Sequence, residues 1–180
     1  MKNLEIFQKK GIEFEQGLSV TEIDKIEQIY EIKFPQELKN MYTELLPISE
    51  GFYKWRDFSN LNVEYIKKIL EKPFKEIENE IDDVEWCDDW GEEPLENERI
   101  RAVEQKLKVA PKLIPIYSHR YVASGKMEQS PVFSVHGADI IYYGENITQY
   151  LEIEFAGRPY NEIDYGKIVQ VPFWSEIVQG

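Results

Sequence analysis

The chain has 180 residues, with 34 acidic and 21 basic side chains and a formal net charge of −13. This length suits one domain whose core is large enough to fold without disulfides or metal. The acidic balance argues against binding to nucleic acid or anionic membranes, because both repel carboxylates. The single cysteine, Cys87, excludes an internal disulfide, and no apolar run approaches the ~20 residues that cross a bilayer. With no apolar core of signal-peptide length near the N-terminus, we expect a cytoplasmic protein that needs no cofactor.

The first third of the chain predicts two amphipathic helices. A weak helix and a short strand around Ile12 and Phe14 come first. Ser19 and Glu22 then have the spacing of a capping box, which marks a helix start. One apolar stripe at helical spacing follows, formed by Ile23, Ile26, Ile29 and Tyr30. On this helix Glu22, Asp24, Lys25 and Glu27 are expected to turn mostly to solvent.

A second helix is predicted after Pro35. Its apolar stripe consists of Leu38, Met41, Tyr42 and Leu45, and Pro47 is expected to end it. The next segment contains Gly51 and several aromatic residues, which is typical of a turn that enters a strand. Within it, Trp55 is expected in the core and Arg56 is expected to pair with a carboxylate.

Helical spacing returns after Asn60. Its stripe consists of Val63, Ile66, Ile69 and Leu70, and Pro73 is expected to break or restart the helix. A further stripe of Ile100, Val103 and Leu107 predicts a helix that leads to Pro111.

Residues 111–155 are dense in β-branched and aromatic side chains, as a buried sheet requires. They predict three strands, with a hairpin turn opened by His136, and then a helix capped by Asn146. The tail predicts a strand at 168–171 and a turn of helix opened by Pro172. The fold class is therefore α+β, a single domain with a central, mostly antiparallel sheet flanked by helices.

Nearly all of the excess charge lies between Glu76 and Glu98. This segment has twelve carboxylates and no Lys or Arg, so the remaining 22 acidic and 21 basic residues net only −1. We interpret 76–98 as an insertion-like segment of a domain (1–180) whose core spans about 18–155. The candidate partner-binding residues are Asp82, Asp83, Glu85, Trp86, Asp88, Asp89, Trp90, Glu92 and Glu93. Tryptophans ringed by charge are typical of interface anchors; the alternative is a solvated loop whose Trp residues pack back on the core.

Metal sites and catalysis have weaker support in the sequence. The four aspartates lack the alternating acids and central Gly of an EF-hand loop, so we predict no metal there. Cys87, His119 and His136 lack the close spacing of a structural zinc motif. One alternative is that His119 and His136 face one another across adjoining strands beside Asp139, yet no phosphate loop or nucleophile elbow accompanies them. The alternative is that His119 and Arg120 hydrogen-bond backbone carbonyls at a strand end, and we predict no enzymatic activity.

Several motifs in order resemble a known family. The helix that starts Ser-Val-Thr-Glu, the segments IKFPQELKNMY and GFYKWRDFS, and the later LIPIYSHRY with SPVFSVHGADIIYYG are similar to the SUKH superfamily of bacterial immunity proteins. The yeast Knr-type cell-wall regulator domain belongs to the same superfamily. The likeness covers about 18–155, with Ser49, Glu50 and Gly51 standing where many members have an Asn-Gly turn.

This resemblance implies a SUKH-like fold and two possible functions. The first is an immunity protein that neutralises a cognate polymorphic toxin, often a nuclease with a basic substrate surface. The second is an intracellular protein-binding scaffold or regulator without a toxin partner. In the first case, the partner expected from the acidic segment is a basic toxin domain.

Overall fold

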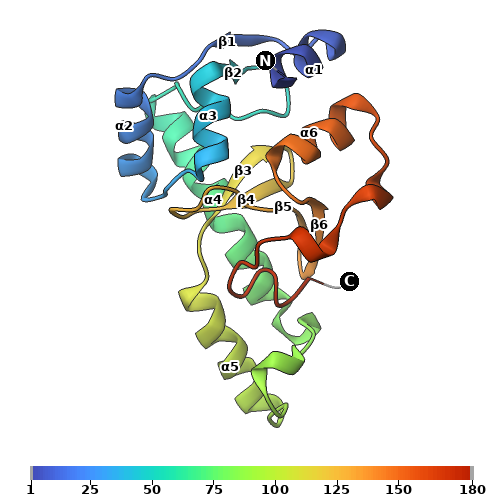
Figure 1. Ribbon diagram of the computed structural model, residues 1–180. Coiled ribbons are helices and arrows are strands. Elements are labelled where there is room, and N and C mark those ends of the chain that lie inside the picture. Colours follow the sequence, from blue (N-terminus) through green and yellow to red (C-terminus); the bar gives the residue numbers. More distant parts are fainter. Residues whose placement is uncertain (1, 179–180) are drawn as a thin grey trace.

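The computed structural model describes residues 2–178, and the side chains of residues 5–95 and 98–178. It is an α+β fold with two antiparallel sheets, which confirms the predicted class (Figure 1). The helices are α1 (Lys2–Lys10), α2 (Val20–Tyr30), α3 (Gln36–Glu44), α4 (Asn60–Asn79), α5 (Glu96–Val109) and α6 (Ile147–Ala156). The strands are β1 (Phe14–Gln16), β2 (Leu45–Pro47), β3 (Leu113–Tyr117), β4 (Arg120–Ala123), β5 (Val132–His136) and β6 (Asp139–Gly144). The short 3₁₀ turns are η1 (Ile81–Asp83), η2 (Asp88–Trp90), η3 (Tyr160–Glu162) and η4 (Tyr165–Lys167).

The larger sheet is an antiparallel meander in the order β3-β4-β5-β6. It has four strands rather than the three predicted, because the chain reverses at Ser118 and His119 within the first predicted strand. Ser118 has a φ of 49°, in the left-handed region that a tight reversal uses. The β5–β6 turn lies between His136 and Asp139, as predicted.

This sheet lies between two hydrophobic cores, because alternate side chains of a strand point to opposite faces. In β4, Val122 packs in the first core, with α1, α2, α3, α6 and the first half of α4. Tyr121 and Ala123 pack in the second core, with α5, the second half of α4 and the C-terminal segment. Figure 1 shows α5, which contributes Val103 and Leu107 to the second core, below the sheet.

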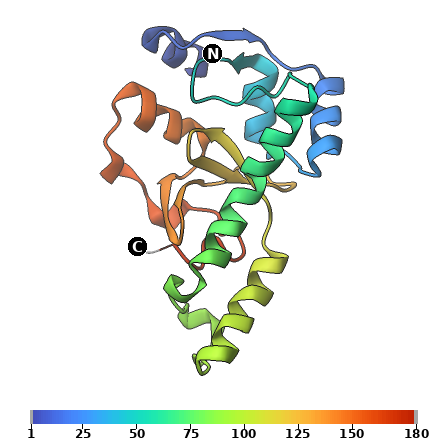
Figure 2. The same cartoon turned by 180° about the vertical axis from the view of Figure 1, so that it is seen from behind.

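Helix α4 is continuous through Pro73, whereas the sequence predicted that the helix would break or restart there. Pro73 removes one helical hydrogen bond and crowds the preceding turn. Packing on both sides offsets this cost: Leu70 is buried in the first core and Ile77 in the second. At 1.5 Å per residue the helix is about 30 Å long, and Figure 2 shows it crossing the molecule from the α2 region to the α5 region.

Most of the helix starts and ends predicted for the N-terminal part are confirmed. Ser19 accepts from the Glu22 amide while Glu22 accepts from the Ser19 amide, so the capping box is complete. Helix α3 ends at Glu44 rather than at Pro47, because residues 45–47 pair with β1. After Gly51, the predicted strand is reduced to one bridge between Phe52 and Tyr117.

The C-terminal segment forms η3, η4 and turns instead of the strand predicted at 168–171. Ile168 and Val171, three residues apart, are both buried in the second core, which the two-residue alternation of a strand would not allow. Phe173 and Trp174 are buried in the same core, as expected.

Candidate partner-binding surface

The acidic tip, defined as residues 82–93, lies at the far end of the molecule between α4 and α5 (Figure 1). Seven of its carboxylate residues are exposed: Asp82, Asp83, Glu85, Asp88, Asp89, Glu92 and Glu93. Within the described side chains only Glu93 has an ion pair, with Arg99 at 2.6 Å. The other six therefore present unneutralised negative charge to solvent.

The base of the tip is tied to α5. Val84 is buried in the second core and its carbonyl accepts a hydrogen bond from the Arg99 guanidinium. Because Arg99 also pairs with Glu93, one side chain joins both ends of the tip to the first turns of α5. The segment that bears the carboxylates is therefore held against α5 and the second core.

The two tryptophans of the tip point inward. Trp86 and Trp90 meet edge to face, with ring centroids 5.2 Å apart, and Trp90 stacks on Phe173. The indole N–H of Trp90 donates to Glu176 at 2.6 Å, and that of Trp86 donates to the Gly91 carbonyl at 2.8 Å. Both rings are half-buried against the second core. This geometry favours the alternative in which they pack on the core; direct contact with a partner stays a prediction.

The side chains considered for metal binding do not come together. Among the described residues, no group of three or more His, Cys, Asp or Glu side chains is arranged to hold a metal ion. Cys87 is half-buried in the tip, whereas His119 and His136 lie at the turns of the four-stranded sheet.

The two histidines do face one another, with ring centroids 4.0 Å apart. Burial, aided by the nearby Arg120, His136 and Lys72, lowers the pKa of His119 to about 4, so its ring is neutral at pH 7. Among the described side chains, neither ring hydrogen-bonds a carboxylate; His119 Nδ1 lies 3.2 Å from Ser118 Oγ. A general base oriented by an acid, as in hydrolases, is not formed by these groups.

Arg120 does not make the hydrogen bonds to backbone carbonyls that were expected for it at a strand end. It is buried under α6, where it donates to Ser134 Oγ at 2.9 Å and lies 3.4 Å from the Glu154 carboxylate. Its guanidinium also covers the Tyr143 ring at 3.8 Å. The backbone carbonyls expected as partners are replaced by side chains from β5, β6 and α6, which sequence spacing does not place beside β4.

Arg56 and Trp55 behave as predicted. The Arg56 guanidinium lies 2.7 Å from Glu22 and 2.8 Å from Glu15, and also donates to the carbonyls of Gln16 and Gly17. Trp55 is fully buried, and its indole N–H donates to the Tyr42 hydroxyl.

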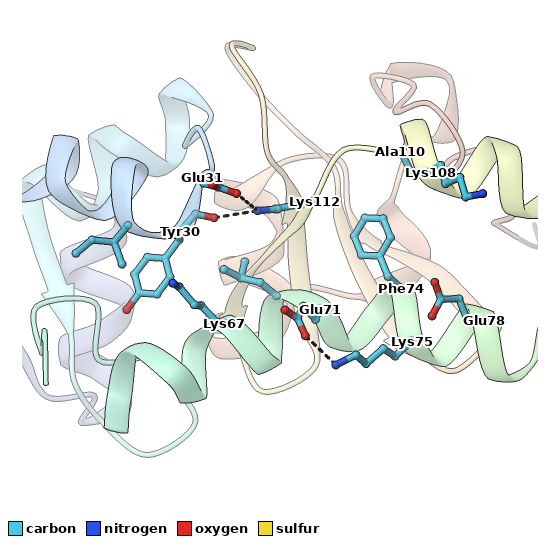
Figure 3. A pocket seen from close by; sticks show the side chains of 12 residues that line it. Tyr30, Glu31, Lys67, Glu71, Phe74, Lys75, Glu78, Lys108, Ala110 and Lys112 are labelled. Atoms are coloured by element: carbon cyan, nitrogen blue, oxygen red, sulfur yellow. Dashed lines mark hydrogen bonds and ion pairs between the residues drawn. The ribbon is translucent and has the colours of Figure 1, made fainter. Parts of the chain in front are cut away.

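A second surface was not found by sequence reasoning. A groove of about 590 Å³ lies between the end of α2, the middle of α4 and residues 108–112 (Figure 3). Four lysines line it, namely Lys67, Lys75, Lys108 and Lys112. They come from two segments that are more than thirty residues apart in the chain. The sequence signal was limited to the lysines of α4, which avoid its apolar stripe.

No family model, curated protein or solved structure matches this chain. No helix within residues 2–178 is both long enough and apolar enough to cross a membrane. The resemblance to the SUKH superfamily therefore rests on the sequence motifs alone.

Proposed function

We propose that the protein is a cytoplasmic immunity protein, and that its acidic tip docks a basic toxin domain and neutralises it. The docking surface is inferred from six exposed carboxylates that have no ion pair among the described side chains and that lie on a segment packed against the second core. The toxin as partner is drawn from the resemblance to SUKH immunity proteins.

The mechanism follows from charge. Toxins partnered with this family are often nucleases, whose substrate surfaces are basic. The tip would cover such a surface and exclude nucleic acid both by occupying the site and by repelling phosphates. Opposed charges of this kind accelerate association, and added salt screens them.

The test is titration calorimetry against the C-terminal domain of the protein encoded beside this gene, at 50 and 300 mM salt. We expect tight binding that weakens at the higher salt. The variant D82N/D83N/D88N/D89N should bind at least 100-fold more weakly and lose most of its salt dependence. Its control carries the same charge change at exposed carboxylates outside the tip, E50Q/E64Q/E104Q/E128Q, and should keep most of the affinity.

Equal losses in the two variants would show that net charge, not the tip, controls binding. Tight binding that is unaffected by the tip variant would place the interface elsewhere. If the neighbouring domain does not bind and a basic cellular protein does, the protein is a scaffold or regulator rather than an immunity protein.

A further inference from the structure

The groove lined by Lys67, Lys75, Lys108 and Lys112, called the lysine groove below, has polar ends and an apolar floor. Leu70 and the ring of Tyr30 are almost fully buried at its floor, beside the half-buried Phe74. Figure 3 shows Lys67 at one end, under Tyr30, and Lys108 at the other, beside Ala110. A ligand that fills the groove would therefore contact an apolar surface between two positive charges.

Two of the four lysines are already neutralised by carboxylates of the groove. Lys75 lies 2.7 Å from Glu71, and Lys112 lies 3.5 Å from Glu31 while it donates to the Tyr30 carbonyl. Among the described side chains, Lys67 and Lys108 have no ion pair, and both are exposed. The lining also contains Glu78, which has no ion pair among the described side chains, so its four lysines exceed its three carboxylates by one. In a chain with a net charge of −13, a groove with an excess of positive charge and an unpaired lysine at each end favours an anionic ligand.

The length of the groove favours a peptide over a small anion. Its lining on α4 runs from Lys67 to Glu78, which is about 16 Å at 1.5 Å per residue. An extended chain covers that distance in about five residues, at 3.2–3.4 Å per residue. A small carboxylate or phosphate would reach only one end, and a nucleic acid strand would bring further phosphates towards a strongly acidic protein.

We propose that this groove binds a short, extended acidic segment of a partner protein, with carboxylates at both ends and an apolar side chain between them. Lys67 and Lys108 pair with the terminal carboxylates, and the central side chain covers Leu70 and Phe74. This site is separate from the acidic tip and does not depend on the toxin hypothesis.

The test uses the full chain labelled with ¹⁵N and two synthetic probes. The acidic peptide is Glu-Glu-Leu-Glu-Glu, and its neutral match is Gln-Gln-Leu-Gln-Gln. We expect the acidic peptide to shift the backbone amide signals of Leu70, Ala110 and Lys112, and the neutral one to leave them in place. Fluorescence anisotropy of the labelled peptides gives the affinities.

The variant K67A/K108A should weaken the acidic peptide at least fivefold. Its control, K9A/K126A, removes two exposed lysines outside the groove and should change the affinity less than twofold. Equal losses in the two variants, or shifts confined to other surfaces, would overturn the proposal. If the same amide signals move with protein concentration alone and stop moving in the tip variant, the occupant is the acidic tip of a second copy, and the proposal of a different partner protein is wrong.

Discussion

The carboxylates of the N-terminal half and those of the acidic tip belong to the same chain but have opposite environments. Glu27 is buried and accepts from Lys33 at 2.6 Å, from Lys39 at 2.8 Å and from the Phe34 amide at 3.0 Å. In the tip, six exposed carboxylate residues have no ion pair within the described side chains. The first environment holds parts of the fold together, whereas the second leaves charge available to a partner.

The pKa values of the N-terminal glutamates reflect this difference. Burial by itself raises the pKa of Glu27, but the bonds from Lys33, Lys39 and the Phe34 amide outweigh it and leave the pKa lowered. Hydrogen bonds from Arg56 and from Ser19 lower the pKa of Glu22 to about 2. Because both groups are ionised more readily in the folded state, each stabilises the fold above its unfolded pKa and less so in acid.

The largest effect is expected from removing both cations of Glu27. The variant K33M/K39M leaves a buried carboxylate whose one remaining donor among the described residues is the Phe34 amide, and it should lose about 3 kcal/mol of stability at pH 7. The pKa of Glu27 should then lie above its unfolded value, so the variant should regain part of this loss when the pH falls below that pKa. The measurement is urea unfolding between pH 4 and pH 7.

The control K9M/K68M removes two exposed lysines that have no ion pair among the described side chains, and should lose less than 0.5 kcal/mol, on the order of a neutral surface change. A K33M/K39M variant as stable as this control would mean that Glu27 does not depend on the two lysines.

A smaller effect is expected at Arg56, which is about one third exposed. The variant R56M removes the bonds to Glu22, Glu15 and two carbonyls, and should lose about 2 kcal/mol at pH 7. In the wild type the Glu22 contribution is complete above pH 4.5 and is lost as the pH falls towards 2. R56M should therefore lose less stability over this range, measured by thermal unfolding, while R101M at an exposed arginine should keep the wild-type slope.

A still smaller effect is expected at Glu37, which joins α3 to α6. Its carboxylate accepts from the amides of Ile147 and Thr148 and from the Thr148 hydroxyl, at 2.8–3.1 Å. Since Asn146 also caps this helix, E37A should cost about 1 kcal/mol. Denaturant unfolding compared with E64A, at an exposed glutamate of α4, would measure it; equal stabilities would exclude a capping role.

These examples show which features could be predicted from the sequence. The Ser19 capping box, the Asn146 cap and the hairpin turn at His136 depend on residues close in the chain, and all three were found. Glu27 was expected to face solvent, because its helical position lies beside charged neighbours. It is buried because the chain after the helix brings Lys33, Lys39 and the Phe34 amide over it. Helical periodicity describes only the faces of one helix, so it could not predict this contact.

The candidate surfaces also differ in whether they are formed by residues close in the chain or by distant segments. The acidic tip is one continuous segment, so its charge could be read directly from residues 76–98. The inward packing of Trp90 depends on Phe173 and Glu176, more than eighty residues later. The lysine groove likewise joins α2, α4 and residues 108–112. Features assembled from distant segments need the tertiary structure, whereas local ones do not.

The smallest effect on stability is expected from the tip. In D82N/D83N/D88N/D89N, four like charges disappear from an exposed segment in which they make no ion pair among the described side chains. We expect the melting temperature to stay within about 2 °C of the wild type, with any change upwards because mutual repulsion is relieved. Differential scanning calorimetry at low and high salt measures this, and the small upward change should vanish at high salt. A large loss of stability would mean that these carboxylates stabilise the fold, and the contrast with Glu27 would then be wrong.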